Sequence, residues 1–248
     1  MALKAVVIGA TKGIGRALAR LLAERGDRVH LLGRDAADLE KCAADLQVRA
    51  PSPGGVTWSL CDLERPEMFA PGLDSADAAL GGFDTVIITA GLFAPQPQLE
   101  ADLAFTARML QVNFTNTLLL CEAARTRLLA RGGGTLCVFS SVAGERGRKP
   151  VVLYGATKAG LSAYLEGLDH KFRAAGLRTI CVKPGFVRTS MTAGLPEPPF
   201  AANPDDVARV AVRAIDRGTP VVYAPPIWGL VMMVIRWLPR TVMRKVGF

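Results

Sequence analysis

Gly9-Ala10-Thr11-Lys12-Gly13-Ile14-Gly15 joins an apolar, β-branched run to a segment with helical periodicity. The glycines let the backbone turn tightly and approach a pyrophosphate, and the N-terminus of the next helix presents unpaired amides with a partial positive charge. At the start of a strand–helix–strand unit, this spacing favours a dinucleotide-binding loop over an ordinary glycine-rich turn. The cofactor contacts predicted from the loop are Gly9, Thr11, Lys12, Gly13, Ile14 and Gly15.

Short apolar runs alternate with longer helical segments along the rest of the chain. The runs are nearly continuously apolar, which is typical of parallel strands covered by helices on both faces. We therefore predict a single α/β domain with a Rossmann-type, doubly wound parallel sheet of about seven strands and helices on both faces. Predicted strands are Leu3–Gly9, Val29–Gly33, Val56–Asp62, Phe83–Ala90, Thr135–Ser141, Arg178–Pro184 and Val221–Ala224; helices are predicted to begin near Gly13, Asp35, Arg65, Leu99, Leu153 and Pro204.

Composition and net charge indicate which kinds of molecule the protein can bind. The 248 residues carry a formal net charge of +8, which suits phosphates, nucleic acid or an anionic membrane. Basic residues are scattered and no nucleic-acid-binding module is recognisable, so nucleic acid is not an expected partner. Five cysteines without C-x-x-C spacing are expected to be small buried hydrophobes in a reducing compartment, and two isolated histidines predict no metal site. Strand-like sequence directly after Met1 predicts no signal peptide, and hence a cytoplasmic protein.

Arg34 follows the second predicted strand directly. An acidic side chain at this position would bind the adenosine ribose and favour NAD, whereas arginine accommodates a 2′-phosphate. Lys12 adds a second positive charge, and Asp35 either caps the next helix or contacts the ribose. The charges favour NADP(H), with NAD(H) as the alternative; both cations could also be ordinary solvated side chains.

Tyr154-Gly155-Ala156-Thr157-Lys158 opens a predicted helix, and Ser141 ends the strand before it. Residues i and i+4 share a helix face, so Tyr154 and Lys158 can point into one cleft. A free tyrosine has a pKa of about 10, too high for efficient proton exchange near neutrality. We expect the ammonium and a cationic oxidised nicotinamide to lower this pKa; a shift of ~3 units requires about 4 kcal/mol. A chance surface pair is the alternative, which Ser141 and the glycine loop disfavour.

Together these motifs resemble the short-chain dehydrogenase/reductase family over essentially the whole chain. The resemblance implies an NAD(P)(H)-dependent oxidoreductase that reduces a ketone to a secondary alcohol, or runs the reverse reaction, as a homodimer or homotetramer. It implies that Tyr154 is the general acid/base and that Lys158 binds the nicotinamide ribose and tunes the tyrosine. Ser141 would hydrogen-bond the substrate oxygen, and Asn113 would support a water-mediated proton relay.

The resemblance also implies further cofactor contacts. They are Asp62 and Leu63 at the adenine, Ala90 and Gly91 after the fourth strand, and Pro184, Gly185, Val187 and Thr189 beside the nicotinamide. Thr89 departs from the family pattern, which usually has asparagine there, and this puts local strand support in doubt. A hydrogen bond from Thr89 to a backbone group could replace it.

The C-terminal half suggests a substrate. Within the family, residues 140–248 resemble reductases of a decaprenyl-phosphate-linked keto-pentose, through Ala143–Arg146, Tyr154–Leu161, Val187–Met191 and Val231–Arg236 with Pro239-Arg240. This implies a polyprenyl-phosphate-linked keto-sugar as substrate, with a long-chain lipid ketone as the alternative. Candidate substrate contacts are Phe93, Arg146, Arg148 and Phe186.

The last segment of the chain is apolar and basic. We assign residues 1–226 to the Rossmann domain and residues 227–248 to a tail that either belongs to that domain or is an interfacial segment. Its longest apolar stretch, Ile227–Ile235, is too short to span a membrane, which takes about 20 residues. Pro239 is predicted to divide the tail into two short helices. Peripheral contact with the inner face of a membrane, a mouth for a lipid-phosphate substrate, and packing on the domain or on another subunit remain open.

A non-catalytic nucleotide-sensing protein on the same fold is the alternative function. Such a protein would not need a serine, tyrosine, lysine and asparagine at these positions, and the four residues therefore favour an enzyme.

Overall fold

One parallel sheet organises the molecule. The computed structural model describes residues 2–51 and 53–246, and within these seven strands lie in the order β3-β2-β1-β4-β5-β6-β7, all paired parallel. The strands are β1 (Lys4–Ile8), β2 (Arg28–Gly33), β3 (Val56–Leu60), β4 (Thr85–Ile88), β5 (Gly134–Phe139), β6 (Leu177–Pro184) and β7 (Val221–Ala224). This confirms the predicted doubly wound parallel sheet.

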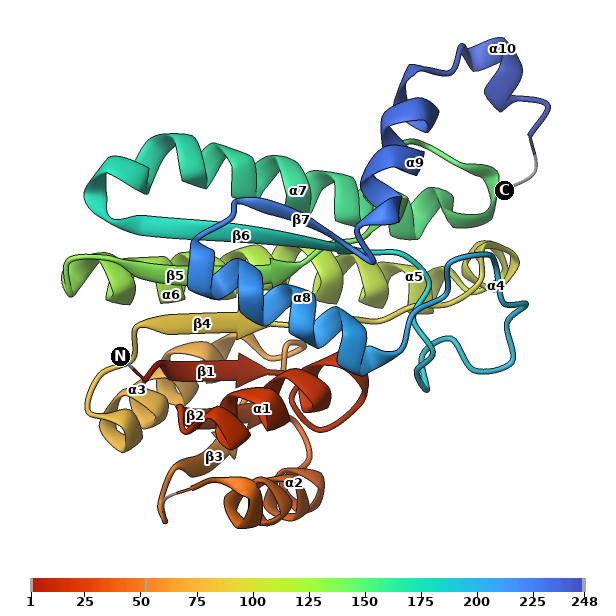
Figure 1. Cartoon of the computed structure of the whole chain (residues 1–248). Helices are drawn as coiled ribbons and strands as arrows, with labels where there is room; N and C mark the ends of the chain where they lie inside the picture. Colours follow the sequence, from red (N-terminus) through yellow and green to blue (C-terminus); the bar gives the residue numbers. More distant parts are fainter. Residues whose placement is uncertain (1, 52, 247–248) are drawn as a thin grey trace.

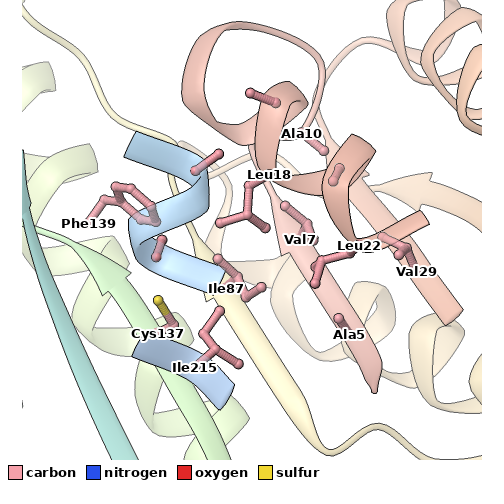
Figure 2. Packing of buried hydrophobic residues seen from close by; sticks show 14 of the residues in the cluster. Ala5, Val7, Ala10, Leu18, Leu22, Val29, Ile87, Cys137, Phe139 and Ile215 are labelled. Carbon is pink, nitrogen blue, oxygen red and sulfur yellow. The ribbon is translucent and has the colours of Figure 1, made fainter. Parts of the chain in front are cut away.

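Helices cover both faces of the sheet (Figure 1). On one face lie α1 (Gly13–Arg25), α2 (Ala36–Arg49) and α8 (Pro204–Arg217); on the other lie α3 (Phe69–Leu80), α6 (Thr117–Ala130) and α7 (Val152–Phe172). Because side chains alternate along a strand, β1 contributes Val7 to the first core and Val6 to the second. Figure 2 shows the first core, where Leu18 and Leu22 of α1 pack over Val7 and Ile87.

The helix ends follow local sequence signals. Asp35 begins α2 as its N-cap, with its carboxylate accepting a hydrogen bond from the Asp38 amide. Gly26 ends α1 at a φ of 90°, a left-handed conformation that glycine adopts without strain. Pro204 and two acids form the first turn of α8, as the sequence predicted.

The helix predicted from near Leu99 is broken into four pieces. It comprises α4 (Gln96–Ala101), α5 (Leu103–Leu110), the π-helical segment η2 (Gln111–Asn116) and α6. Asp102 separates the first two because its carboxylate caps the amide of Phe105. The helix predicted near Arg65 begins instead with the 3₁₀ turn η1 (Pro66–Met68), and α3 follows from Phe69.

The described part of the tail forms two helices, α9 (Ile227–Trp237) and α10 (Arg240–Met243), separated at Pro239 as predicted. Residues 247 and 248 of the predicted tail lie outside the described residues. Figure 1 shows both helices at the end of the molecule toward which the β1 arrow points. None of the helices within residues 2–51 and 53–246 has the length and apolar character needed to cross a membrane.

Candidate active site

The glycine loop and the end of β4 meet at the point where the strand order reverses. β1 pairs with β2 on one side and with β4 on the other, and ligands of doubly wound sheets bind beyond the strand ends at this switch. A Cβ on Gly15 would lie 2.2 Å from the Gly9 carbonyl oxygen, and Gly13 has a φ of 53°. Only glycines allow this close turn, which leaves the first amides of α1 free to face an anion.

Thr89 supports this junction in place of the family's usual asparagine. Its hydroxyl donates hydrogen bonds to the carbonyl oxygens of Ile8, at 2.9 Å, and of Gly9, at 3.2 Å. The expectation that Thr89 can bond to the backbone is therefore met, and β1 and β4 are held together at the switch point.

A hollow of about 600 Å³ opens in front of the loop. Its lining includes loop residues Thr11, Lys12 and Gly13 and, across the gap, Thr189 and Ser190. Four arginines also line it: Arg16, Arg20, Arg49 and Arg188. Asp45 and Asp205 line it too and pair with Arg16, Arg49 and Arg20. The donors that fit a pyrophosphate are therefore the loop amides and the hydroxyls.

The residues predicted to bind adenosine include two exposed cations. Arg34 lies 3.4 Å from the carboxylate of Glu64, which Arg108 also contacts, and Lys12 lies 3.0 Å from Asp38. Exposed pairs such as these cost little to separate, so both cations can turn to a phosphate. Asp35 caps α2, the first of its two predicted roles. Asp62 caps the Glu64 amide, and the Leu63 carbonyl accepts a hydrogen bond from Asn116.

Tyr154 and Ser141 face each other across the turn between β5 and α7. Ser141 lies two residues beyond β5, where its hydroxyl caps the Ala143 amide at 3.1 Å and also hydrogen-bonds Tyr154. Tyr154 lies in the first turn of α7, and the ring of Phe93 packs edge-on against it with centroids 5.0 Å apart. The structure therefore brings Phe93, a predicted substrate contact, to the catalytic tyrosine candidate.

Lys158 lies one turn beyond Tyr154 on the same helix. Its ammonium is buried, donates to the Phe139 carbonyl oxygen at 2.9 Å and lies 5.6 Å from the centroid of the tyrosine ring. Asn113 approaches from η2, where its amide makes two 2.7 Å hydrogen bonds with the backbone of Leu92. A Cβ on Gly91 would touch both Asn113 and Lys158, at 3.2 and 3.9 Å. All four predicted catalytic residues thus converge at one place.

In the chain without cofactor, the pKa of Tyr154 lies above its usual value. Burial raises it to about 12, and the hydrogen bond with Ser141 opposes that rise only in part. Burial lowers the pKa of Lys158 to about 8. The predicted lowering of the tyrosine pKa includes the charge of a bound oxidised nicotinamide, and it stays a prediction.

The stretch after β6 forms the opposite wall. Val187 pairs with Ala202 in an isolated parallel bridge, and Thr192 accepts a hydrogen bond from the Thr189 amide at 3.1 Å. Pro184 ends β6, and its carbonyl accepts from the Ser141 hydroxyl at 3.4 Å. The predicted nicotinamide stretch therefore lies directly beside the serine.

The remaining predicted substrate contacts differ in their surroundings. Phe186 is half-buried within the stretch after β6. Arg146 donates a hydrogen bond to the carbonyl oxygen of Leu238 at 2.9 Å. Leu238 is the C-cap residue of α9, so Arg146 holds the tail. Burial lowers the pKa of Arg148, and its Nε has no hydrogen-bond partner among the described residues.

Sequence reasoning missed three residues around the site. The Gln96 amide oxygen caps the Leu153 amide at 3.1 Å, next to Tyr154. Glu145, buried in the loop after Ser141, pairs with Lys183 and with Arg236 of α9. Trp228 packs on Gly185. Each contacts residues that are far away in the sequence. The sequence held one signal for them, the charged Lys183 within an apolar strand, which indicates a buried partner of opposite charge.

Comparison with known proteins gives consistent matches. A family model described as short chain dehydrogenase matches residues 4–199. An uncharacterized oxidoreductase from the mprA 5′ region of Streptomyces coelicolor is 35% identical over 246 residues, covering 97% of this chain and 94% of the relative. Cis-4-hydroxycyclohexanecarboxylate dehydrogenase of Sinomonas cyclohexanicum is 33% identical over 195 residues, or 77% of this chain and 76% of that enzyme.

Solved structures give the same result. A protein described as a short chain dehydrogenase/reductase family protein superposes with a TM-score of 0.76 at 28% identity, covering 89% of this chain and 94% of that chain.

Proposed function

The chain belongs to the short-chain dehydrogenase/reductase family, and we propose that it interconverts a ketone and a secondary alcohol with Tyr154 as general acid/base. One observation carries the proposal: Ser141 and Lys158 both lie against Tyr154, and Asn113 converges on the same place. A binding protein would gain nothing from burying an ammonium beside a tyrosine.

Each side chain has a defined task in this proposal. The Ser141 hydroxyl and the Tyr154 phenol hold the carbonyl oxygen, and Tyr154 gives it a proton during reduction. The pKa of about 12 keeps the phenol protonated at neutral pH, which suits the acid role in reduction. In oxidation the phenol must first lose its proton, which needs an added positive charge close by.

A nicotinamide cofactor fits the residues present. It supplies or accepts the hydride when bound. The glycine loop would hold its pyrophosphate, Thr189 would lie beside the nicotinamide, and Lys158 would bind the nicotinamide ribose. We propose NADP(H) as the preferred form, with NAD(H) as the alternative, because Arg34 and Lys12 are exposed cations on one side of the loop.

We propose a lipid-linked ketone or alcohol as the substrate class, either a polyprenyl-phosphate-linked keto-sugar or a long-chain lipid ketone. The first is the substrate that the resemblance proposed from the sequence of residues 140–248 implies. The apolar α9 beside the stretch after β6 is compatible with both. A homodimer or homotetramer in the cytoplasm, with peripheral membrane contact through the tail, completes the proposal.

Tyr154→Phe tests the catalytic role. It should remove turnover of every active ketone while cofactor binding, followed by nucleotide fluorescence, stays nearly unchanged. Tyr164→Phe is the matched control, because Tyr164 lies on the same helix and hydrogen-bonds Glu122 away from the site. A screen of lipid-phosphate keto-sugars and long-chain ketones with NADPH and NADH identifies the substrate. Turnover retained by Tyr154→Phe would reject the mechanism.

A further inference from the structure

α9 is apolar on its outer face as well as on its inner one. Met232 and Ile235 point inward and are buried against Val142. On the outer face, Leu230 is 57% exposed and Trp237 is 83% exposed. Ile227, Leu230, Val234 and Trp237 follow one another by three, four and three residues, so they form one stripe along the helix. We call these four residues the outer stripe.

The charges around the outer stripe have one sign. Residues 218–248 include no Asp or Glu, but carry Arg236, Arg240, Arg244 and Lys245. Arg236 pairs with Glu145, whereas no ion pair involving Arg240, Arg244 or Lys245 exists within the part of the chain that the structure describes. Three exposed, unpaired cations therefore flank an exposed apolar stripe.

The loop after Ser141 holds the two tail helices in place. Arg146 donates to the carbonyl oxygen of Leu238 at 2.9 Å, just beyond α9, and Lys149 donates to that of Arg244 at 2.6 Å, just beyond α10. These cations satisfy carbonyls that helix C-termini leave unpaired. The outer stripe is thus presented in a fixed orientation by the loop that leads to Tyr154.

The first turn of α9 lies at the site. Trp228 packs on Gly185, and Phe200 of the segment after β6 meets the Trp228 ring edge-on, with centroids 6.3 Å apart. Phe200 is itself 54% exposed and has a φ of 64°, an uncommon backbone conformation for a large side chain. Apolar surface therefore continues from α9 toward the stretch beside the predicted nicotinamide position.

We propose that the outer stripe docks on an anionic lipid bilayer, with Arg240, Arg244 and Lys245 at the headgroups. An 11-residue helix is about 16 Å long, so it can lie in the interface but cannot span the bilayer. Trp237 ends the stripe, and tryptophan suits the headgroup level of a bilayer, where its ring contacts apolar chains and its N–H contacts polar groups. The orientation brings the stretch after β6, beside the predicted nicotinamide position, toward the lipid, where a lipid-linked substrate resides.

A second copy of the chain suits this face less well. Two-fold pairing through α9 would bring the cations of both tails to one interface without any Asp or Glu from residues 218–248 to pair with them, which costs free energy through like-charge repulsion. The stripe on a helix of about 16 Å is also much smaller than the ~800 Å² per partner that a stable interface buries. The bilayer proposal rests on and deepens the membrane contact named in the proposed function, but it does not depend on the reaction that the site performs.

Vesicle flotation tests the proposal with the full-length protein. We expect binding to vesicles of phosphatidylcholine and phosphatidylglycerol in equal parts, and weak or no binding to phosphatidylcholine alone. Leu230→Glu with Val234→Glu should abolish binding. Replacing Arg240, Arg244 or Lys245 by Gln should weaken binding about fivefold for each charge removed.

Val48→Glu is the matched control, because Val48 is 89% exposed on α2 and belongs to no such stripe. It should bind the vesicles like the unchanged protein. Absence of binding to the anionic vesicles, or equal binding by the Leu230→Glu, Val234→Glu variant, overturns the proposal. So does a reduced oligomer size of that variant in sedimentation velocity without a vesicle effect, since α9 would then be a subunit interface. Turnover assays on a water-soluble ketone separate these outcomes from failure of the catalytic proposal.

Discussion

The indole Nε1 of Trp228 lies directly over Gly185, so closely that a Cβ on residue 185 would come within 2.0 Å of it. Gly185 follows the last residue of β6, and Trp228 lies in the first turn of α9. This contact joins the tail to the stretch after β6, which forms the wall of the site beside Ser141. A change on one side must move the other.

Gly185→Ala should displace Trp228 and loosen α9. The methyl group overlaps a packed ring, and overpacking of this kind costs about 1–3 kcal/mol. We expect a lower free energy of unfolding in denaturant, together with red-shifted tryptophan fluorescence. Gly147→Ala is the control, because a Cβ there meets nothing within 4 Å. An equal effect of both substitutions would show that the contact with Trp228 is not the cause.

Lys158 makes stability depend on pH in a defined direction. Burial lowers its pKa from 10.5 to about 8, so the folded state disfavours the ammonium. The resulting contribution is fully present above about pH 10.5, is lost as the pH falls toward 8, and is constant below that. The stability of the protein relative to Lys158→Met should thus rise by up to about 3 kcal/mol between these limits.

Thermal unfolding of both proteins from about pH 7 to about pH 10 measures this difference. Comparing the two cancels the titration of all other groups. Lys171→Met provides the control for removing an exposed lysine from the same helix. A pH-independent difference between the protein and Lys158→Met would contradict the lowered pKa.

The fold was predictable because its signals are local. Continuous apolar runs such as the one around Val86–Ile88 are buried on both faces, and caps such as Asp35 and Gly26 act within one turn. The helix boundaries within residues 96–130 could not be predicted. The break at Asp102 and the π-helical turn at Asn113 depend on which backbone amide each side chain reaches in three dimensions.

The catalytic candidates were predictable from spacing, since i and i+4 on a helix must face the same way. The effect of burial on the pKa of Tyr154 could not be predicted, because it depends on all the residues packed around the ring. The role of Arg146 in holding Leu238 could not be predicted either, since the two residues are 92 positions apart.

Arg34→Ala should change cofactor preference. A charge-assisted hydrogen bond to a 2′-phosphate contributes about 1.5–3 kcal/mol, so the KM for NADPH should rise tenfold or more. The KM for NADH should change little, because NADH lacks that phosphate. Arg65→Ala removes another exposed arginine at the same end of the sheet, one that forms an ion pair with Glu67, and is the control. An unchanged ratio of the two KM values for Arg34→Ala would exclude this arginine as the source of selectivity.

Glu145→Gln should destabilise the protein through Lys183. The Glu145 side chain is 5% exposed and that of Lys183 is 12% exposed. Burial alone would lower the pKa of Lys183, but the hydrogen bond and charge of Glu145 raise it above its usual value. Glutamine keeps the shape and removes the charge, so the ammonium stays buried without a counter-ion, which costs about 3–5 kcal/mol.

A double-mutant cycle distinguishes loss of the pair from simple disruption. Lys183→Met together with Glu145→Gln should cost clearly less than the sum of the single changes, because no unpaired charge remains. Free energies of unfolding in denaturant at neutral pH provide all three values, and additive effects would contradict the coupling. Arg236 of α9 also loses its carboxylate partner in Glu145→Gln. That variant should therefore release the tail to protease sooner than Lys183→Met does, since only the first removes an anchor of α9.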